Sequence, residues 1–203
     1  MVEVAIVNYG VGNLKSVKRA IERAGARPII TLSADDVAKA DAIILPGVGS
    51  FKSAMEGLKP LMSTLREAIS GGKPVLGICL GLQLFFEWSE EGGGVGGLGL
   101  MKGVVDRLPS SVKVPHMGWN TISIESQNPL VEGVPDGSYV YFVHSYKANP
   151  EDPGNIVATT VYGVKFPSIV WRKPLIFGTQ FHPEKSGGVG FTMIKNFVSM
   201  ARR

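Results

Sequence analysis

The sequence predicts an α/β protein of three layers: a mostly parallel central sheet with helices on both faces, and a smaller mixed or antiparallel part toward the C-terminus. Short, continuously apolar runs alternate with segments of helical periodicity up to Gly92, as in parallel sheets covered on both sides. Beyond Gly92 the apolar pattern has a period of two residues, which indicates antiparallel or mixed strands. A chain of 203 residues without a long linker is expected to form one domain over residues 1–203.

Strands and helices are expected in turn along the N-terminal half. The apolar runs predict strands at residues 4–7, 28–32, 42–45 and 74–78. Helices are expected at residues 14–24, from residue 34 onward, around Met55 and at residues 65–69. The second of these helices begins after Ser33, which has Asp36 three positions later and so resembles a capping box.

The second half begins with a glycine run at residues 92–97, which predicts a flexible loop. Alternating patterns at residues 138–143 and 156–160 then predict short strands. Apolar residues at helical spacing over residues 191–200 predict a final amphipathic helix that packs back on the sheet.

The formal net charge is +4, and the basic residues are scattered. Lys15, Lys18 and Arg19 fall on the polar side of the first expected helix, and Arg202 and Arg203 form only a short tail. Nucleic-acid binding usually needs a denser basic stripe with stacking aromatic residues, so no nucleic-acid partner is expected.

No apolar run is long enough to cross a bilayer, so no membrane partner is expected. The first seven residues carry an early acid and no basic segment, which indicates a first strand rather than a signal peptide. The single cysteine cannot form an internal disulfide, and this suits a reducing, cytoplasmic location.

Two glycine-rich stretches raise the possibility of phosphate binding. Residues 9–13 follow a strand and precede a helix, but they lack the third glycine of the dinucleotide-binding fingerprint. Residues 92–97 lack the Gly-Lys-Ser/Thr of a P-loop. A tight strand-to-helix turn explains the first stretch better, and neither a nucleotide cofactor nor a metal site is expected.

Cys79 lies in the run Gly-Ile-Cys-Leu-Gly, which follows a short apolar stretch and opens an apolar-periodic one. This is the sequence form of a nucleophile elbow, with sulfur in place of a hydroxyl. Flanking glycines permit a sharp turn, and a following helix would favour the thiolate through its positive end. A buried structural cysteine at a strand end remains the alternative interpretation.

A cysteine nucleophile needs a general base and a group that orients that base. The chain has three histidines, His116, His144 and His182. Only His182 has an acid two residues away, Glu184, and in an extended backbone residues two apart point to the same side. Because the intervening proline favours that extended conformation, His182 and Glu184 are the expected base and orienting acid.

Acyl transfer also needs hydrogen-bond donors for the developing oxyanion. The N–H of Leu80, directly after the cysteine, is one expected donor. The second is expected from the loop Pro46–Ser50, at Val48 or Gly49, because it follows the third strand and its glycines let an N–H turn inward.

These features together resemble the class I glutamine amidotransferases, which carry a Cys-His-Glu triad. Four further stretches resemble the glutaminase subunits of imidazole glycerol phosphate synthases. They are NYGVGN at residues 8–13, PHMGWN at 115–120, YFVHSY at 141–146 and FHPEKS at 181–186. Each stretch is a weak marker alone, but four in order beside a complete triad make a specific match over the full length.

The resemblance implies that Cys79 attacks the side-chain amide of glutamine and forms a γ-glutamyl thioester, which water then hydrolyses to glutamate. It implies that His182 accepts and returns the proton while Glu184 orients it. The residues implied to bind glutamine are Gly47, Gly49, Gln83, Glu91, His144, Ser145 and Tyr146. For Glu91 an ordinary solvated acid at a helix end is the alternative.

The resemblance also implies a partner, a cyclase subunit with a (β/α)₈ barrel that receives the ammonia for histidine biosynthesis. Residues implied to lie at that interface are Asn13, Met117, Trp119, Tyr141 and Lys185. Core packing is the alternative for Met117 and Tyr141. The loop at Pro46–Gly49 is implied to change conformation when the partner binds its ligand, which would make glutaminase activity conditional.

Three other functions fit parts of the same pattern. The chain could be the amidotransferase subunit of another synthase, because the triad is shared and only the flanking motifs differ. It could be a stand-alone γ-glutamyl hydrolase or cysteine peptidase, which would be active without a partner. A regulatory pseudo-enzyme is the non-catalytic alternative, against which the intact Cys79, His182 and Glu184 argue.

Overall fold

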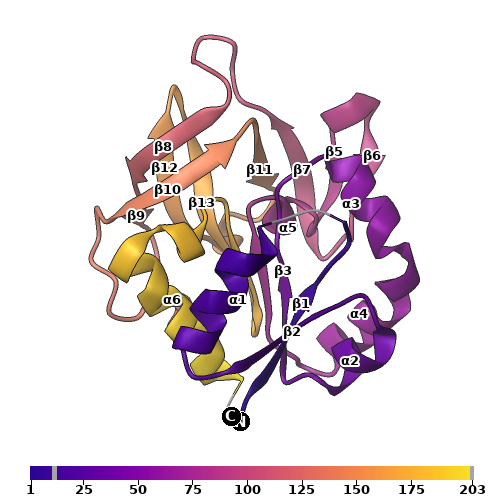
Figure 1. The fold of residues 1–203 in the computed structure, drawn as a ribbon. Helices are drawn as coiled ribbons and strands as arrows, with labels where there is room; N and C mark the ends of the chain where they lie inside the picture. The colour runs from indigo at the N-terminus through magenta and orange to yellow at the C-terminus, as the bar shows by residue number, and fades with distance from the viewer. Residues whose placement is uncertain (11–12, 202–203) are drawn as a thin grey trace.

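The computed structural model describes residues 1–10 and 13–201. Its centre is an eight-stranded sheet in the order β2-β1-β3-β4-β14-β13-β12-β9 (Figure 1). The five strands from β2 to β14 are parallel neighbours, and β13, β12 and β9 continue the sheet in antiparallel pairing. The expected α/β class with a large central sheet is therefore confirmed.

The strands of the central sheet agree with the apolar runs. They are β1 (Glu3–Val7), β2 (Arg27–Thr31), β3 (Ala42–Leu45), β4 (Val75–Ile78), β9 (Ser123–Ile124), β12 (Ile156–Tyr162), β13 (Val164–Arg172) and β14 (Ile176–Thr179). Both β3 and β4 are buried along their whole length, as continuous apolar runs predict for strands covered on both faces.

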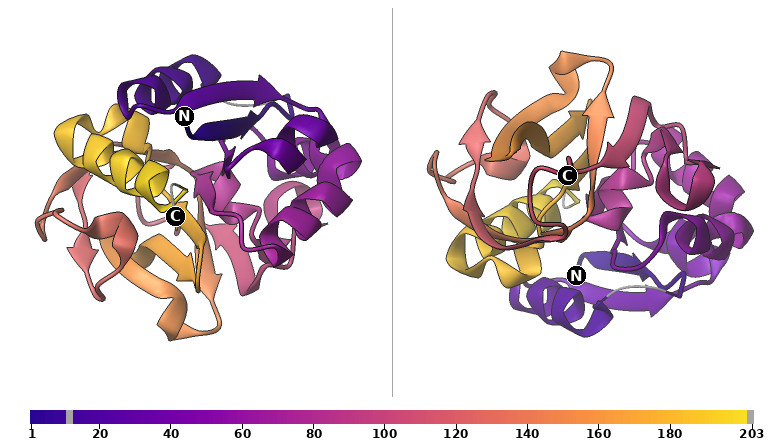
Figure 2. Two further views of the ribbon diagram at one scale, coloured as in Figure 1. Left: turned by 90° about the horizontal axis from the view of Figure 1, so that it is seen from below. Right: turned by 90° about the horizontal axis from the view of Figure 1, so that it is seen from above.

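Helices cover both faces of the sheet (Figure 2). On one face α1 (Leu14–Arg23) and α6 (Gly187–Met200) lie next to each other, and on the other lie α2 (Ala34–Lys39), α3 (Phe51–Leu58) and α4 (Met62–Ser70). Alternate residues of β1 serve the two cores, since Val4 and Ile6 pack with α1 and α6 while Ala5 and Val7 pack with the other helices.

Local signals explain where these helices start. The Ser33 hydroxyl accepts a hydrogen bond from the N–H of Asp36 at 3.4 Å, as the expected capping motif requires. Ser50 caps α3 in the same way, through the N–H of Ser53 at 3.3 Å. At α6 the side chains of Met193, Ile194, Phe197 and Val198 are buried, which confirms the expected packing of the last helix on the sheet.

The C-terminal half does not form only a separate smaller part, because several of its strands extend the central sheet. Its strands β12, β13 and β14 join the central sheet, and β14 returns to pair with β4. Outside that sheet, β8 (His116–Thr121) pairs with β10 (Tyr139–His144). A four-stranded mixed sheet contains β11 (Tyr146–Pro150), β7 (Met101–Arg107), β5 (Phe86–Ser89) and β6 (Val95–Gly96).

The segment after Cys79 is shorter than the apolar periodicity suggests. Helix α5 (Leu80–Gln83) is a single turn in which every residue is buried, and β5 begins three residues later. An apolar run that is buried on all sides shows no polar face, so its periodicity does not reveal where the helix ends.

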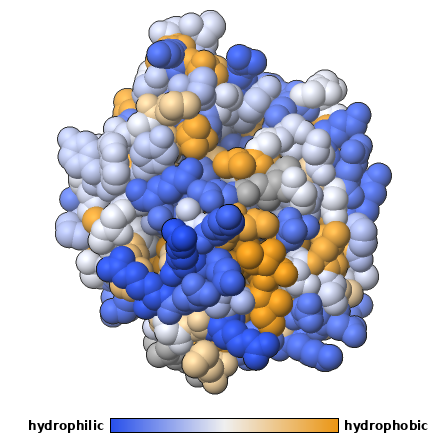
Figure 3. Space-filling model, in the orientation of Figure 1, coloured by the Kyte–Doolittle hydropathy of each residue, from blue (hydrophilic) through white to orange (hydrophobic). Residues whose placement is uncertain are grey.

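None of the helices in the described ranges is both long and apolar enough to cross a membrane. The face seen in Figure 3 is mainly hydrophilic over α1, where Lys15, Lys18 and Arg19 are exposed. Two sequence features lie outside the described residues: the middle of the NYGVGN stretch, residues 11 and 12, and the terminal Arg202 and Arg203.

Candidate active site

Cys79 occupies a sharp turn between β4 and α5, with φ of 53° and ψ of −104°. No other described residue except glycine has a positive φ. The turn needs its neighbouring glycines, because a Cβ on Gly81 would overlap the carbonyl of Leu45 and one on Gly77 would overlap Gly81. The strained backbone of a nucleophile elbow is therefore present at the expected position.

His182 and Glu184 follow the neighbouring strand β14 and form a buried pair. Nδ1 of His182 lies 2.9 Å from Oε1 of Glu184, and both side chains are at most 2% exposed. Within the described residues, Nε2 of His182 forms no hydrogen bond to a nitrogen or oxygen atom. The acid thus holds one ring nitrogen and leaves the other available to Cys79.

Electrostatics link His182 to both partners. Burial by itself would lower the pKa of His182, but the sulfur of Cys79 and the carboxylate of Glu184 outweigh burial and raise the pKa to about 10. The imidazole is therefore stabilised in its protonated form beside the sulfur. A protonated imidazole at this position would stabilise a thiolate, the form in which a cysteine is nucleophilic.

Two further groups contact the sulfur. Sγ of Cys79 lies 3.6 Å from the carbonyl oxygen of Val143 and 3.6 Å from Nε2 of Gln180. Gln180 is fully buried, and it is not among the site residues expected from the sequence. Its position two residues before His182 was the available signal, because residues at that spacing in extended backbone share a side.

The expected oxyanion loop packs directly against the elbow. A Cβ on Gly47 would overlap Leu80 and the N–H of Gly81, so only glycine allows this approach. Gly49 has φ of +125°, and both Val48 and Gly49 are exposed beside Cys79. The structure thus brings this loop and the start of α5 together, as the sequence predicts for two oxyanion donors.

Tyr9 holds the start of that loop and was not predicted. Its buried hydroxyl donates a hydrogen bond to the carbonyl of Pro46. Helix α3 approaches so closely that a Cβ on Gly57 would overlap the Tyr9 backbone. Burial, with a smaller contribution from the nearby Cys79, raises the Tyr9 pKa far above its usual value, so the phenol stays a neutral donor.

A cavity of about 320 Å³ opens in front of Cys79. Most of the residues implied to bind glutamine surround it. The lining residues are Val48, Gly49, Cys79, Leu80, Gln83, Glu91, Pro115, Val143, His144, Ser145 and Tyr146. Gly47 lies behind this lining against Leu80, where it supports the loop. Pro115 and Val143 line the cavity but were not expected as site residues.

The polar side chains of the cavity are held in place. Oε2 of Glu91 accepts a hydrogen bond from the N–H of Phe51 at 3.0 Å, at the start of α3. Nε2 of Gln83 donates to the carbonyl of Tyr146 at 2.9 Å. Glu91 is therefore fixed at the cavity wall and is not simply a solvated acid at a helix end.

His144 and His116 form a neutral pair beside the cavity. Nδ1 of His144 lies 2.9 Å from the carbonyl of Tyr146, and its Nε2 lies 2.9 Å from Nδ1 of His116. Burial lowers the pKa of His144 to about 3 and that of His116 to about 4. Each ring therefore donates through Nδ1 and accepts through Nε2, with Asn120 as donor to His116 at 3.3 Å.

Four of the five residues implied at a partner interface lie together near β8 and β10. Trp119 and Tyr141 are opposite each other in the pair, with ring centroids 5.8 Å apart, and Nζ of Lys185 lies 5.8 Å from the Tyr141 ring centroid. Met117 is 63% exposed, so the core alternative for it is wrong, while Tyr141 is half-buried. Asn13 precedes α1, where it donates to the Ser16 hydroxyl at 2.9 Å.

Another aromatic residue of that surface was missed. Tyr139 is 64% exposed and shares the outer face of β10 with Tyr141, two residues away. Exposed Met117, Trp119 and Tyr139 on one strand pair, with Tyr141, form an apolar surface, which is unusual for an isolated face in contact with water.

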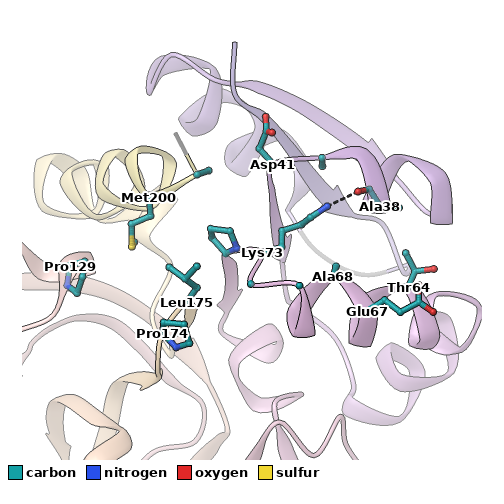
Figure 4. A pocket seen from close by; sticks show the side chains of 15 residues that line it. Ala38, Asp41, Thr64, Glu67, Ala68, Lys73, Pro129, Pro174, Leu175 and Met200 are labelled. Atoms are coloured by element: carbon teal, nitrogen blue, oxygen red, sulfur yellow. Dashed lines mark hydrogen bonds between the residues drawn. The ribbon is translucent and has the colours of Figure 1, made fainter. Parts of the chain in front are cut away.

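A cavity larger than the one at Cys79 lies at the opposite end of the strands (Figure 4). It has a volume of about 750 Å³ and is bordered by Asp41, Lys73 and Leu175, each just before a strand. Nζ of Lys73 donates to the carbonyl of Ala38 at 2.7 Å. Since ligands of such sheets bind at the carboxyl ends of strands, the smaller cavity at Cys79 is the candidate active site. Within residues 1–10 and 13–201, no cluster of side chains is arranged to hold a metal ion.

Comparison with known proteins agrees with this geometry. Residues 5–201 match the family Glutamine amidotransferase class-I. An imidazole glycerol phosphate synthase subunit HisH from Natronomonas pharaonis is 49% identical, with 97% of this chain and 94% of the relative covered. The subunit of the same name from Methanosarcina acetivorans is 50% identical over 98% of this chain and all of the relative.

Solved structures share the fold. A crystal structure of a glutamine amidotransferase superposes with a TM-score of 0.77 at 17% identity, covering 98% of this chain and 99% of that one. PurLQS from Thermotoga maritima gives a TM-score of 0.75 at 22% identity, with 98% of each chain covered. With the family match and these relatives, the chain belongs to the class I glutamine amidotransferases, among the HisH subunits.

Proposed function

We propose that this chain is the glutaminase subunit of an imidazole glycerol phosphate synthase, hydrolysing glutamine to glutamate and ammonia for a cyclase subunit. The observation that carries the proposal is the position of Cys79. It lies on a strained elbow, beside the His182–Glu184 pair, at the wall of a cavity of about 320 Å³. The membership among HisH subunits supports the choice of synthase.

In the first half of the reaction the thiolate of Cys79 attacks the side-chain amide carbon of glutamine. A carbon–sulfur bond forms, and the carbonyl electron pair moves onto oxygen, where the N–H groups of Leu80 and of Val48 or Gly49 would stabilise it. When the tetrahedral intermediate collapses, the carbon–nitrogen bond breaks. His182 supplies the proton, so the nitrogen leaves as ammonia and a γ-glutamyl thioester remains.

In the second half the neutral His182 takes a proton from water as the water oxygen attacks the thioester carbon. The resulting tetrahedral intermediate expels the sulfur, whose electron pair returns to Cys79 as thiolate. Glutamate leaves, and the imidazolium–thiolate pair is restored. Glu184 remains an anion throughout and keeps the ring oriented through Nδ1.

The cavity has groups suited to an amino acid. The Glu91 carboxylate would attract the α-ammonium group, and its bond to the Phe51 N–H fixes its direction. Gln83 and residues 143–146 also line the cavity, where the glutamine carboxylate and amide would find hydrogen-bond partners. A cavity of about 320 Å³ with these groups suits a free amino acid such as glutamine.

A partner is favoured by the chemistry of the product and by the exposed aromatic surface. Ammonia released into neutral water becomes ammonium and loses its nucleophilic lone pair. A (β/α)₈-barrel cyclase seated on Met117, Trp119, Tyr139, Tyr141 and Lys185 would receive it without that loss. Trp and Tyr residues carry much of the binding energy at such interfaces.

Glutaminase activity would depend on that partner through the loop at Pro46–Gly49. Gly49, with φ of +125°, can reverse its peptide at little steric cost, while Tyr9 holds the loop at Pro46. A small rearrangement of residues 48 and 49 would then bring an N–H to the oxyanion position, which is a population shift of a two-state loop.

The test measures glutamate formation by the chain alone, with a barrel cyclase, and with the cyclase plus its nucleotide ligand. We expect slow turnover alone and the fastest turnover in the complete mixture, with ammonia appearing in the cyclase product rather than in solution. Equal rates in all three mixtures would contradict the partner dependence, and turnover of larger γ-glutamyl substrates by the chain alone would favour a stand-alone hydrolase.

A further inference from the structure

The side chain of Gln180 connects the nucleophile to the glutamine cavity. Gln180 directly follows β14 and is 0% exposed. Its Nε2 lies 3.6 Å from Sγ of Cys79, and its Oε1 lies 3.2 Å from Nε2 of Gln83. A fully buried amide in contact with both residues has no solvent to satisfy it, so its hydrogen bonds must be made within this site.

The direction of each hydrogen bond follows from one backbone carbonyl. The oxygen of Tyr146 can only accept, so the atom of Gln83 that lies 2.9 Å away is the amide nitrogen. The second hydrogen of that nitrogen then points to Gln180, whose nearest atom must be the oxygen Oε1. The nitrogen of Gln180 is therefore the atom that faces the sulfur, because reversing Gln180 would place two donors together and reversing Gln83 would place its oxygen against two acceptors.

His144 donates to the same carbonyl. Its Nδ1 lies 2.9 Å from the Tyr146 oxygen, which thus accepts from both His144 and Gln83. The backbone N–H of Gln180 donates to the carbonyl of Ser168 at 2.9 Å and so holds the start of this side chain. The bond from Gln83 to Oε1 then keeps the side-chain amide of Gln180 from turning away. The donor that faces Cys79 is thus fixed before any substrate arrives.

We propose that Gln180 is a further catalytic residue, whose side-chain N–H donates to the thiolate of Cys79, and that Gln83 orients it for this role. The proposal rests on the proposed function of Cys79 as nucleophile. A hydrogen bond from a neutral donor stabilises the anion of the sulfur over the neutral thiol. It acts in the resting enzyme and again when the carbon–sulfur bond of the thioester breaks and its electron pair returns to Sγ.

The test is the pH dependence of Cys79 alkylation by iodoacetamide, followed by intact mass, since the chain has a single cysteine. Gln180→Met removes the donor while keeping a side chain of similar length. The midpoint pH of alkylation should rise by about one unit in this variant, because a hydrogen bond to an ion contributes roughly a factor of ten. Gln127→Met makes the same change at an exposed site and should leave the midpoint unchanged.

Two more variants separate catalysis from packing. Gln83→Leu removes the group that orients Gln180 and should raise the midpoint by a smaller amount. Gln180→Glu keeps the shape but presents an acceptor to the sulfur, so its midpoint should rise at least as far as that of Gln180→Met, and it serves where the Met variant does not fold. A folded Gln180 variant with the wild-type midpoint would overturn the proposal.

Alkylation needs no glutamine, so this result is independent of the substrate. If glutamine fails to protect wild-type Cys79 from a glutamine-like affinity reagent, the proposed function fails while the alkylation midpoints still report on Gln180. If glutamine protects Cys79 but the midpoints of wild type and Gln180→Met coincide, only the role of Gln180 is wrong.

Discussion

Nδ1 of His182 and Oε1 of Glu184 lie 2.9 Å apart, and only Pro183 separates the two residues in the chain. The backbone of His182 is extended, with φ of −99° and ψ of 96°, as expected for a residue before proline. The short 3₁₀ turn at Pro183–Lys185 then brings the carboxylate under the ring. A local sequence feature therefore brings the carboxylate and the imidazole together.

Removing this carboxylate should change the alkaline side of the pH profile. Glu184 is one of the groups that raise the pKa of His182 to about 10, so Glu184→Gln should lower that pKa. His182 would then lose its proton at lower pH. Glutaminase kcat should fall at least about ten-fold, and the alkaline limb of its pH profile should move to lower pH. Glu151→Gln, at an exposed site, is the matched control. An unchanged alkaline limb in Glu184→Gln would contradict the assigned role.

The buried histidine pair should make the fold sensitive to mild acid. The pKa values of His116 and His144 are lowered to about 4 and about 3, so below the ordinary value of 6.5 the unfolded chain takes up protons that the folded chain does not. Stability to urea should therefore decline as the pH falls from about 6.5 toward 4.

The His116→Phe variant tests this assignment. Phenylalanine can keep the stack with Tyr162, whose ring centroid is 4.0 Å from that of His116, but it cannot take up a proton. It should be less stable near neutral pH, because Nε2 of His144 loses its donor, and it should show a smaller loss of stability toward pH 5. A steeper loss than in wild type would contradict the neutral pair.

Two exposed tryptophans allow a controlled test of the proposed cyclase interface. Trp119 is 56% exposed on β8, and Trp88 is 46% exposed on the separate sheet that contains β5. Trp119→Ala should weaken binding of the cyclase by about 2 kcal/mol, whereas Trp88→Ala should leave that affinity unchanged. Titration calorimetry with the purified cyclase measures the affinity of each variant. Equal losses of affinity in both variants would contradict an interface at Trp119.

Ser186 connects β10, a strand of the proposed interface, to His182, the proposed catalytic base. Its hydroxyl donates to the carbonyl of His182 at 2.7 Å and accepts from the N–H of Tyr141 at 3.0 Å. Ser186→Ala leaves both groups without this partner and should cost about 1–3 kcal/mol of unfolding free energy. It should also reduce the stimulation of glutaminase activity by the cyclase. The control Ser199→Ala, at an exposed site on α6, should change neither the free energy of unfolding in urea nor the stimulation by the cyclase in rate assays.

The parts of the site that the sequence predicted are those encoded by neighbouring residues. The elbow at Cys79 follows from its flanking glycines, and the pairing of His182 with Glu184 follows from the proline between them. The first strands of the sheet were likewise predictable, because β3 and β4 are continuous apolar runs buried on both faces.

The missed parts depend on contacts between distant segments. Gln180 contacts Cys79 from 101 positions away, and Tyr9 reaches Pro46 from 37 positions away. The return of β14 to pair with β4 likewise leaves no periodic signal, so the sequence did not show that the C-terminal strands extend the central sheet. Glutamine-binding and interface residues were named only through the family resemblance, since exposed and cavity-lining side chains follow no repeating pattern.

The most direct test of the account is labelling of Cys79 by a glutamine-like affinity reagent in the presence of the cyclase and its ligand. Intact mass should show one reagent per chain, and an excess of glutamine should prevent its attachment. His182→Asn should slow the reaction strongly, because the sulfur loses the imidazolium that favours its anion. A wild-type chain that stays unlabelled, or labelling that glutamine does not prevent, would contradict the proposed glutaminase site.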